Sequence, residues 1–381
     1  MDLNLSEEHL MVRENVRNFA EREIRPVAKE LDEKAEFSAE LTRRMGELGL
    51  FGIYLPEKYG GHGMDYISYI IAVEELARVD GSQAATLAAH NSLGIGPLYY
   101  YGNEEQKMKY LPRLCKGDAL WAFGLTEPDA GSDSRGSKTR ATLENGEWVI
   151  NGSKIFITNG SVDISIGSTV QAVTDDNGGK KEFTTILVDK DTPGFVRQAM
   201  HGKMMWRASD TAQLFFDDCR VPEKNVLGKI GEGSKIMLST LDSGRLSIAA
   251  MGLGCAQGAF ELALAYAQER KQFGKPIAKF QAIAFKLADM AMKIELARNL
   301  LYKACWLKDT NQPFAKEAAM SKLYCSEIAK EVADEAVQIH GGYGLMKDYD
   351  VERFYRDQRL LQIGEGTSEI QRLVISRYIG C

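Results

Sequence analysis

The spacing of apolar residues changes twice along this chain of 381 residues, and that change limits the folds it can adopt. Up to about residue 117, apolar residues recur every three or four positions, which predicts amphipathic helices. Between about residues 119 and 227, short β-rich runs replace them, and from residue 233 the helical spacing returns over longer stretches. The order predicts an α+β fold with an N-terminal helical domain (1–118), a middle antiparallel β-domain (119–228) and a C-terminal four-helix bundle (229–381).

Local signals sharpen this outline. Ser6, followed by two glutamates, predicts the start of the first helix. Turns between strands are predicted at Asn145-Gly146, Asn151-Gly152, Asn159-Gly160 and Asp176-Asn177-Gly178. Within the bundle, one apolar stripe at helical spacing comprises Leu287, Met290, Ile294, Ala297 and Leu301.

Composition excludes several classes of function. The net charge of −6, without a Lys/Arg run, argues against a nucleic-acid partner. The six cysteines are scattered, which indicates reduced thiols, and none of the five histidines is spaced as a metal ligand. The first eight residues resemble neither a secretory signal nor a transit peptide, and we expect no membrane span and a cytoplasmic location.

Glycines of residues 252–258 suggest a dinucleotide-binding turn, but the pattern does not fit one. Gly252, Gly254 and Gly258 are spaced one residue too long for that fingerprint, and they follow a helical run rather than a strand. Close packing between helices explains these small residues better.

Glu365 lies between Gly364 and Gly366, just before a predicted helix start at Ser368-Glu369-Ile370-Gln371. Glycines on both sides allow unusual turns and the close approach of a substrate. The positive end of the helix would favour the anionic carboxylate. Taken alone, a solvated surface glutamate in a turn is the commoner interpretation.

A second polar segment, residues 123–133, runs from a strand end into a turn rich in hydroxyl and carboxylate side chains. Such a loop can bind a phosphate or the polar edge of a flavin. A plain turn that satisfies its own hydrogen bonds fits the same composition.

Several segments resemble the acyl-CoA dehydrogenases, a family of FAD-dependent flavoenzymes. Two long family signatures match in the right order, and the resemblance covers essentially the whole chain. The helix, β and helix order is also that of the family. The matching segments are residues 124–136, 338–357, 148–154, 207–211 and 269–274.

The resemblance implies a role for individual residues of this chain. Contacts to the FAD ring and its surroundings are implied for Phe123, Leu125, Thr126, Ser132, Phe156 and Thr158. Contacts to the rest of FAD, partly across a subunit interface, are implied for Arg270, Phe273, Gln281, Gln338, Gly341, Gly342, Thr367 and Glu369. Contacts to the acyl-CoA are implied for Ser132, Asp242, Arg245 and Gly364.

Glu365 matches the catalytic base of the family. The resemblance implies that its backbone N–H and an FAD hydroxyl polarise the thioester carbonyl while its carboxylate removes the α-proton. A pKa raised toward neutrality by burial would suit this task. Some members carry the base at the position of Gly244, so a glycine there and a glutamate at 365 leave one candidate.

The substrate class is less constrained. Gly364 stands where many straight-chain dehydrogenases have tyrosine, which favours a short, branched or cyclic acyl group. Ala84 replaces the arginine that glutaryl-CoA enzymes use, which disfavours a dicarboxylic substrate. The resemblance further implies a homotetramer and electron-transferring flavoprotein as the electron acceptor. An oxidase, monooxygenase or desulfinase-like reaction, or a non-enzymatic scaffold that keeps FAD for folding, stays open.

Overall fold

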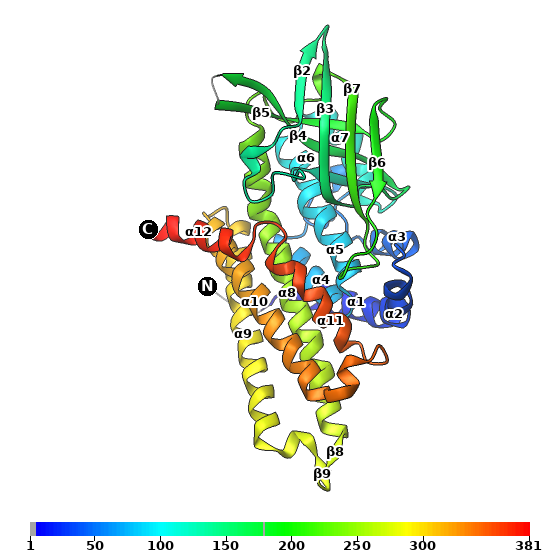
Figure 1. Cartoon of the computed structure of the whole chain (residues 1–381), viewed down its shortest axis with the longest axis vertical. Helices are drawn as coiled ribbons and strands as arrows, with labels where there is room; N and C mark the ends of the chain where they lie inside the picture. The colour runs from blue at the N-terminus through cyan, green and yellow to red at the C-terminus, as the bar shows by residue number, and fades with distance from the viewer. Residues whose placement is uncertain (1–4, 178–179) are drawn as a thin grey trace.

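Figure 1 shows the computed structural model, which describes residues 5–177 and 180–381. The β-sheet lies at one end of the long axis, and one long helix, α8 (Gly233–Glu269), runs from it to a small hairpin at the other end. The N-terminal helices cover one side of this arrangement.

Helices make up the first part of the chain. Ser6 caps the first of them, since its hydroxyl accepts a hydrogen bond from the His9 N–H, which confirms the predicted start. Short π-helical turns cover Ala20–Ile24 and His90–Ile95, and a 3-10 turn covers Glu57–Tyr59. The α-helices are α1 (Glu7–Phe19), α2 (Arg25–Lys34), α3 (Ala39–Glu47), α4 (Tyr66–Ala77), α5 (Gly81–Ala89), α6 (Gly96–Tyr101) and α7 (Glu104–Cys115).

A seven-stranded sheet follows, in the order β1-β4-β2-β3-β7-β6, with β5 paired to β4. Four pairings are antiparallel as expected, but β1 with β4 and β2 with β4 are parallel, so a wholly antiparallel sheet was wrong. The β2–β3 hairpin lies between β1 and β4 in the chain and provides the long crossover that a parallel pair needs. The strands are β1 (Leu120–Gly124), β2 (Arg140–Glu144), β3 (Glu147–Thr158), β4 (Ser165–Asn177), β5 (Lys180–Asp189), β6 (Phe195–Ala199) and β7 (Thr211–Pro222).

The four predicted turns have different outcomes. Asn145-Gly146 and Asn159-Gly160 are turns, Asn151-Gly152 is not, and Gly178 of the fourth lies outside the described residues. Asn145 and Gly146 have φ of 51° and 83° and join β2 to β3, as a two-residue hairpin requires. Asn151-Gly152 lies inside β3, where the pairing with β7 shifts register. A Cβ on Gly152 would lie 2.6 Å from Thr139 Oγ1, so this glycine serves close packing at a bulge.

The C-terminal part is helical again. It confirms the predicted apolar stripe and the predicted close packing at the glycines of residues 252–258. All five residues of the apolar stripe of α9 are buried. A Cβ on Gly254 would lie 2.2 Å from the Glu74 carbonyl oxygen, and one on Gly252 would lie 2.7 Å from the Cys325 carbonyl oxygen. The elements are α8 (Gly233–Glu269), β8 (Lys271–Gln272), β9 (Lys275–Pro276), α9 (Gln281–Asp309), α10 (Ala315–His340), α11 (Val351–Asp357) and α12 (Ser368–Ile379), with 3-10 segments at Ile277–Lys279, Gly341–Leu345 and Gln358–Gln362.

Helix α8 is the one described helix that bears on the expectation of no membrane span. By length and composition it qualifies, with a mean hydropathy of 1.4 in its most apolar window. Of that window, 67% is buried inside the fold. The helix packs against α4, α9 and α10, so its apolar residues form the core of the bundle.

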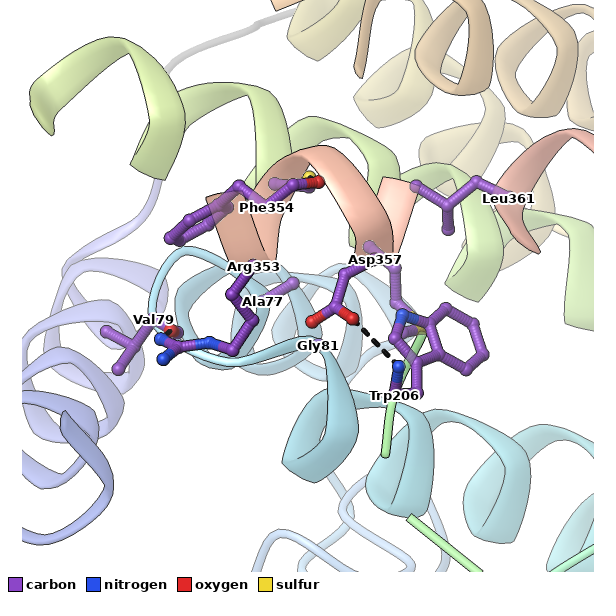
Figure 2. Close-up of a pocket in the computed structure, with 10 residues that line it drawn as sticks. Ala77, Val79, Gly81, Trp206, Arg353, Phe354, Asp357 and Leu361 are labelled. Carbon is purple, nitrogen blue, oxygen red and sulfur yellow. Dashed lines mark hydrogen bonds between the residues drawn. The ribbon is translucent and has the colours of Figure 1, made fainter. Parts of the chain in front are cut away.

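The three parts of the chain meet at α11 (Figure 2). Asp357 accepts a hydrogen bond of 2.8 Å from the Trp206 backbone N–H, which comes from the β-domain side. Arg353 donates to the Val79 carbonyl oxygen at 3.1 Å, on the N-terminal side. Burial, together with the nearby Asp80 carboxylate, raises the pKa of Asp357 to about 7.

Candidate active site

The loop before α12 holds Glu365 in a left-handed conformation. Its φ is +52°, and that of Gly366 is +93°. For a residue with a Cβ this conformation costs about 1–2 kcal/mol. The surrounding contacts must therefore hold the turn in place.

The carboxylate of Glu365 is set up to exchange a proton near neutral pH. Although the residue is only half-buried, its Oε2 is shielded from solvent and has no hydrogen-bond partner among the described residues. Burial raises the pKa of Glu365 to about 7, against the opposing charges of Lys322 and Arg245. Its backbone N–H also has no acceptor in the described part of the chain.

Gly244 on α8 lies directly against this carboxylate. A Cβ built on Gly244 would lie 1.8 Å from Glu365 Oε2 and 3.3 Å from Leu93 Cδ2. Residues 244 and 365, the two positions at which members of the family resembled carry the base, are therefore neighbours in space. A glycine at 244 is what leaves room for the carboxylate.

The start of α12 differs by one residue from the prediction. Thr367, rather than Ser368, caps the helix, and its hydroxyl accepts from the Ile370 N–H. The Ser368 hydroxyl instead donates to Glu327 on α10 at 2.6 Å. Gln371 does not complete a capping box, because its amide donates to the carbonyl oxygens of Glu365 and Gly366.

The residues expected to contact acyl-CoA are only partly brought together. Arg245 follows Gly244 on α8, is buried, and forms an ion pair with Asp242. Asp242 lines a cavity of about 210 Å³ between α6 and α8, which Lys308 of α9 also lines. Ser132 lies exposed on the loop after β1.

Two positions bear on the acyl group. A Cβ on Gly364 would come within 3.0 Å of Leu360 Cδ2, so a larger residue would have to displace that side chain. Ala84 is fully buried in α5.

The edge of the sheet offers a surface that fits a flat ring system. Phe156 lies in a bulge of β3 with φ of +59°, and the residue is 64% exposed. The Ile155 N–H donates to the Thr126 carbonyl oxygen at 2.9 Å, which ties the loop after β1 to this bulge. Phe123 and Leu125 are buried beneath the loop, and Thr158 is half-buried at the end of β3. A strained, exposed aromatic residue at the end of a sheet fits a face of the isoalloxazine ring of FAD.

A second group of predicted FAD residues lies at the opposite end of the molecule, beside the β8–β9 hairpin (Figure 1). Phe273 is 93% exposed, and the Arg270 guanidinium lies 5.6 Å from the Tyr343 ring centre. Within one chain the structure does not bring this group to Phe156. The others in the group, Gln281, Gln338, Gly341 and Gly342, are exposed, and a Cβ on either glycine would meet nothing within 4 Å.

Thr367 caps α12 and Glu369 lies in its first turn, directly after the Glu365 loop. The structure therefore places these two predicted residues with the base rather than with either end of the molecule.

Comparison with known proteins identifies the chain. Family models for the acyl-CoA dehydrogenase N-terminal, middle and C-terminal domains match residues 6–118, 122–219 and 231–380. The chain belongs to the acyl-CoA dehydrogenase family. It is an oxidoreductase of a family that uses FAD, and the α+β architecture predicted above is confirmed.

Three relatives illustrate the similarity. The probable acyl-CoA dehydrogenase YngJ of Bacillus subtilis (strain 168) is 53% identical over 380 residues, with all of both chains covered. The structure of butyryl-CoA dehydrogenase from Megasphaera elsdenii matches with a TM-score of 0.96 at 44% identity, again over all of both chains. A structure from work on the electron-transferring flavoprotein of Acidaminococcus fermentans matches with a TM-score of 0.97 at 46% identity, covering 100% of each chain.

Sequence reasoning missed the polar side chains that support the Glu365 loop. Lys322 is fully buried, and its ammonium donates to the Gly366 carbonyl oxygen at 2.8 Å. One signal was available, because Lys322 falls on the stripe formed by Ala318, Cys325 and Ala329, the buried face of α10. A charged residue at an apolar position of a helix indicates a specific partner.

Proposed function

We propose that this family member removes hydrogen from the α- and β-carbons of a short-chain acyl-CoA to give the 2-enoyl-CoA, with Glu365 as the base. The observation that carries the proposal is the shielded, unpaired Oε2 of Glu365, with a pKa raised to about 7 by burial. A buried oxygen without a hydrogen-bond partner is costly unless a ligand supplies one. We propose that the α-carbon of a bound thioester lies against this oxygen and gives up its proton to it.

In this scheme the chain binds and orients the thioester. The free backbone N–H of Glu365 donates to the thioester carbonyl, which makes the α-proton more acidic. The Glu365 carboxylate then takes that proton at Oε2, in the space left by Gly244. Bound FAD would supply the acceptor for the hydride of the β-carbon.

The FAD ring would lie against Phe123, Leu125, Thr126, Ser132, Phe156 and Thr158. Arg270 and Phe273 flank β8, at the end of the molecule opposite the large sheet. We therefore propose that these two residues, with Gln281, Gln338, Gly341 and Gly342, hold the rest of an FAD bound by a neighbouring subunit. Thr367 and Glu369 would contact FAD near the base. Apolar side chains exposed along α9, namely Phe285, Met292 and Leu296, support subunit contacts in a homotetramer.

The comparisons support two further proposals. Similarity to butyryl-CoA dehydrogenase favours a short acyl group, and Gly364 adds room for branching or a ring beside the base. Similarity to the structure from the flavoprotein work favours electron-transferring flavoprotein as the acceptor. We also propose domain boundaries after residues 118 and 228 and a cytoplasmic location.

Anaerobic titration of the FAD-loaded protein with acyl-CoAs tests the function. The panel comprises butyryl, isobutyryl, isovaleryl, cyclohexanecarbonyl, octanoyl and glutaryl thioesters, and loss of flavin absorbance reports reduction. We expect reduction by the short or branched members and not by the glutaryl thioester. No reduction by any thioester would refute the proposed dehydrogenation.

A further inference from the structure

Two buried side chains, those of Lys322 and Gln371, donate hydrogen bonds to the backbone carbonyl groups of Glu365 and Gly366. The Gln371 side-chain amide donates to the carbonyl oxygens of Glu365 at 3.2 Å and Gly366 at 2.8 Å. The Lys322 ammonium donates to the same Gly366 oxygen at 2.8 Å. Lys322 and Gln371 are both fully buried, and they come from different helices, α10 and α12.

These contacts act where the backbone is strained. Two consecutive residues with positive φ, Glu365 and Gly366, are held only if the adjoining peptide planes are fixed. Gln371 fixes the plane after Glu365, and Lys322 with Gln371 fixes the plane after Gly366. The carbonyls thereby face the protein, while the Glu365 N–H and carboxylate have no hydrogen-bond partner among residues 5–177 and 180–381.

Attachment of the loop to α10 does not depend on Lys322. Ser326 donates to the Leu361 carbonyl oxygen at 2.8 Å. Glu327 accepts from Gln362 at 2.7 Å on one side of the loop and from Ser368 at 2.6 Å on the other. A neutral donor would satisfy the Gly366 carbonyl equally well, so the charge of Lys322 needs a separate explanation.

That explanation is the neighbouring carboxylate. Burying an ammonium group is costly, and burial lowers the pKa of Lys322 to about 8, with the Glu365 charge acting in the opposite direction. Among the described residues Lys322 has no carboxylate within ion-pair distance. The other titratable groups around this pair are Arg245, Tyr69, Glu327 and Glu369.

We propose that Lys322 and Gln371 are positioning residues for the base: both hold the left-handed turn, and Lys322 also stabilises the ionised form of Glu365. This inference rests on the proposed function, since it assigns support to the residue proposed as the base. Two effects are assigned. Lys322 and Gln371 both fix the geometry of the loop, and Lys322 alone supplies a charge beside the Glu365 carboxylate.

Three variants separate these effects in the pH profile of kcat/KM for flavin reduction. Lys322→Met removes the charge and one donor, so the apparent pKa of the base should rise by about one unit or more and the plateau should fall. Gln371→Leu removes a neutral donor, so the plateau should fall by about tenfold or more with no shift in pKa. Ser326→Ala, which removes a contact of equal length from the flank of the loop, should change neither.

The outcomes are distinguishable from failure of the proposed function. If no thioester reduces wild-type flavin, the dehydrogenation itself is wrong. If wild type is active and Lys322→Met keeps the wild-type pKa and plateau, the positioning inference is wrong. Should Lys322→Met fail to fold, Lys322→Arg keeps the charge and must keep the apparent pKa, and a shifted pKa in that variant would overturn the role of the charge.

Discussion

Replacing Gly244 with alanine should raise or preserve stability while disabling the chemistry. A new Cβ would lie 1.8 Å from Glu365 Oε2, whereas ordinary van der Waals contact begins at 3.4 Å. The carboxylate oxygen must therefore retreat by about 1.6 Å. It can do so by rotating its own side chain, so the backbone of α8 need not move.

The effect of this substitution on stability and its effect on the reduction rate have opposite signs. Alanine for glycine inside a helix stabilises by about 0.5–1 kcal/mol. Misplacing a reacting group by about 1 Å can cost about 100-fold in rate. We therefore expect Gly244→Ala to unfold at no lower temperature than wild type and to reduce its flavin about 100-fold more slowly with its best acyl-CoA.

Gly254→Ala on the same helix is the matched control. There the Cβ would lie 2.2 Å from the Glu74 carbonyl oxygen, a backbone atom of α4 that cannot rotate away. Overpacking of this kind costs about 1–3 kcal/mol. Thermal unfolding should thus occur at a lower temperature, while the reduction rate per FAD-loaded molecule should stay near that of wild type.

Thermal unfolding and stopped-flow flavin reduction, both normalised to bound FAD, make the comparison. If Gly244→Ala reduces flavin as fast as wild type, then Glu365 is not the base or does not react from its position beside Gly244. If it loses stability as Gly254→Ala does, the carboxylate is not free to rotate.

Two further predictions follow from the same geometry and from the α11 junction. Glu365→Gly should abolish flavin reduction by acyl-CoA. Adding Gly244→Glu to that variant should raise the reduction rate at least tenfold, because the two positions touch. A double variant as inactive as the single one would contradict this prediction. Asp357 is protonated in the fold up to pH about 7 but ionises from about 3.8 when unfolded, so its contribution to stability falls as pH rises between those values. Thermal unfolding temperatures of Asp357→Asn should therefore decline less steeply from pH 5 to 7 than those of wild type, and parallel declines would refute the assignment.

Periodicity and helix signals in the sequence were sufficient for most of the architecture. The stripe on α9 and the glycines of α8 were interpreted correctly, because burial and close packing leave a direct mark on residue type. The parallel pairing of β1 with β4 was missed, since β-propensity does not encode which strand becomes the neighbour. Asn151-Gly152 carries a strong turn signal, but packing against Thr139 turns it into a bulge.

In the active site, too, the features marked by local sequence were predicted, and those that depend on distant residues were not. Glu365 stood out between its two glycines, and the family resemblance named its role. The cap was assigned to Ser368 because Thr367 and Ser368 are both good capping residues, and the choice depends on Glu327, which is distant in sequence. Lys322 was missed for the same reason, because its partner is the carbonyl of Gly366 rather than a nearby side chain.

Exchange of the α-proton of a bound thioester with deuterated solvent tests the central claim most directly, because it reports removal of that proton apart from the later electron transfer. With wild-type protein loaded with FAD, we expect exchange into butyryl-CoA at a rate that rises with pH through about 7, as the Glu365 carboxyl ionises. With Glu365→Gln, retaining FAD and thioester affinity, exchange should fall by about 10²–10⁴-fold. Exchange at the wild-type rate in that variant would contradict the assignment of Glu365 as the base.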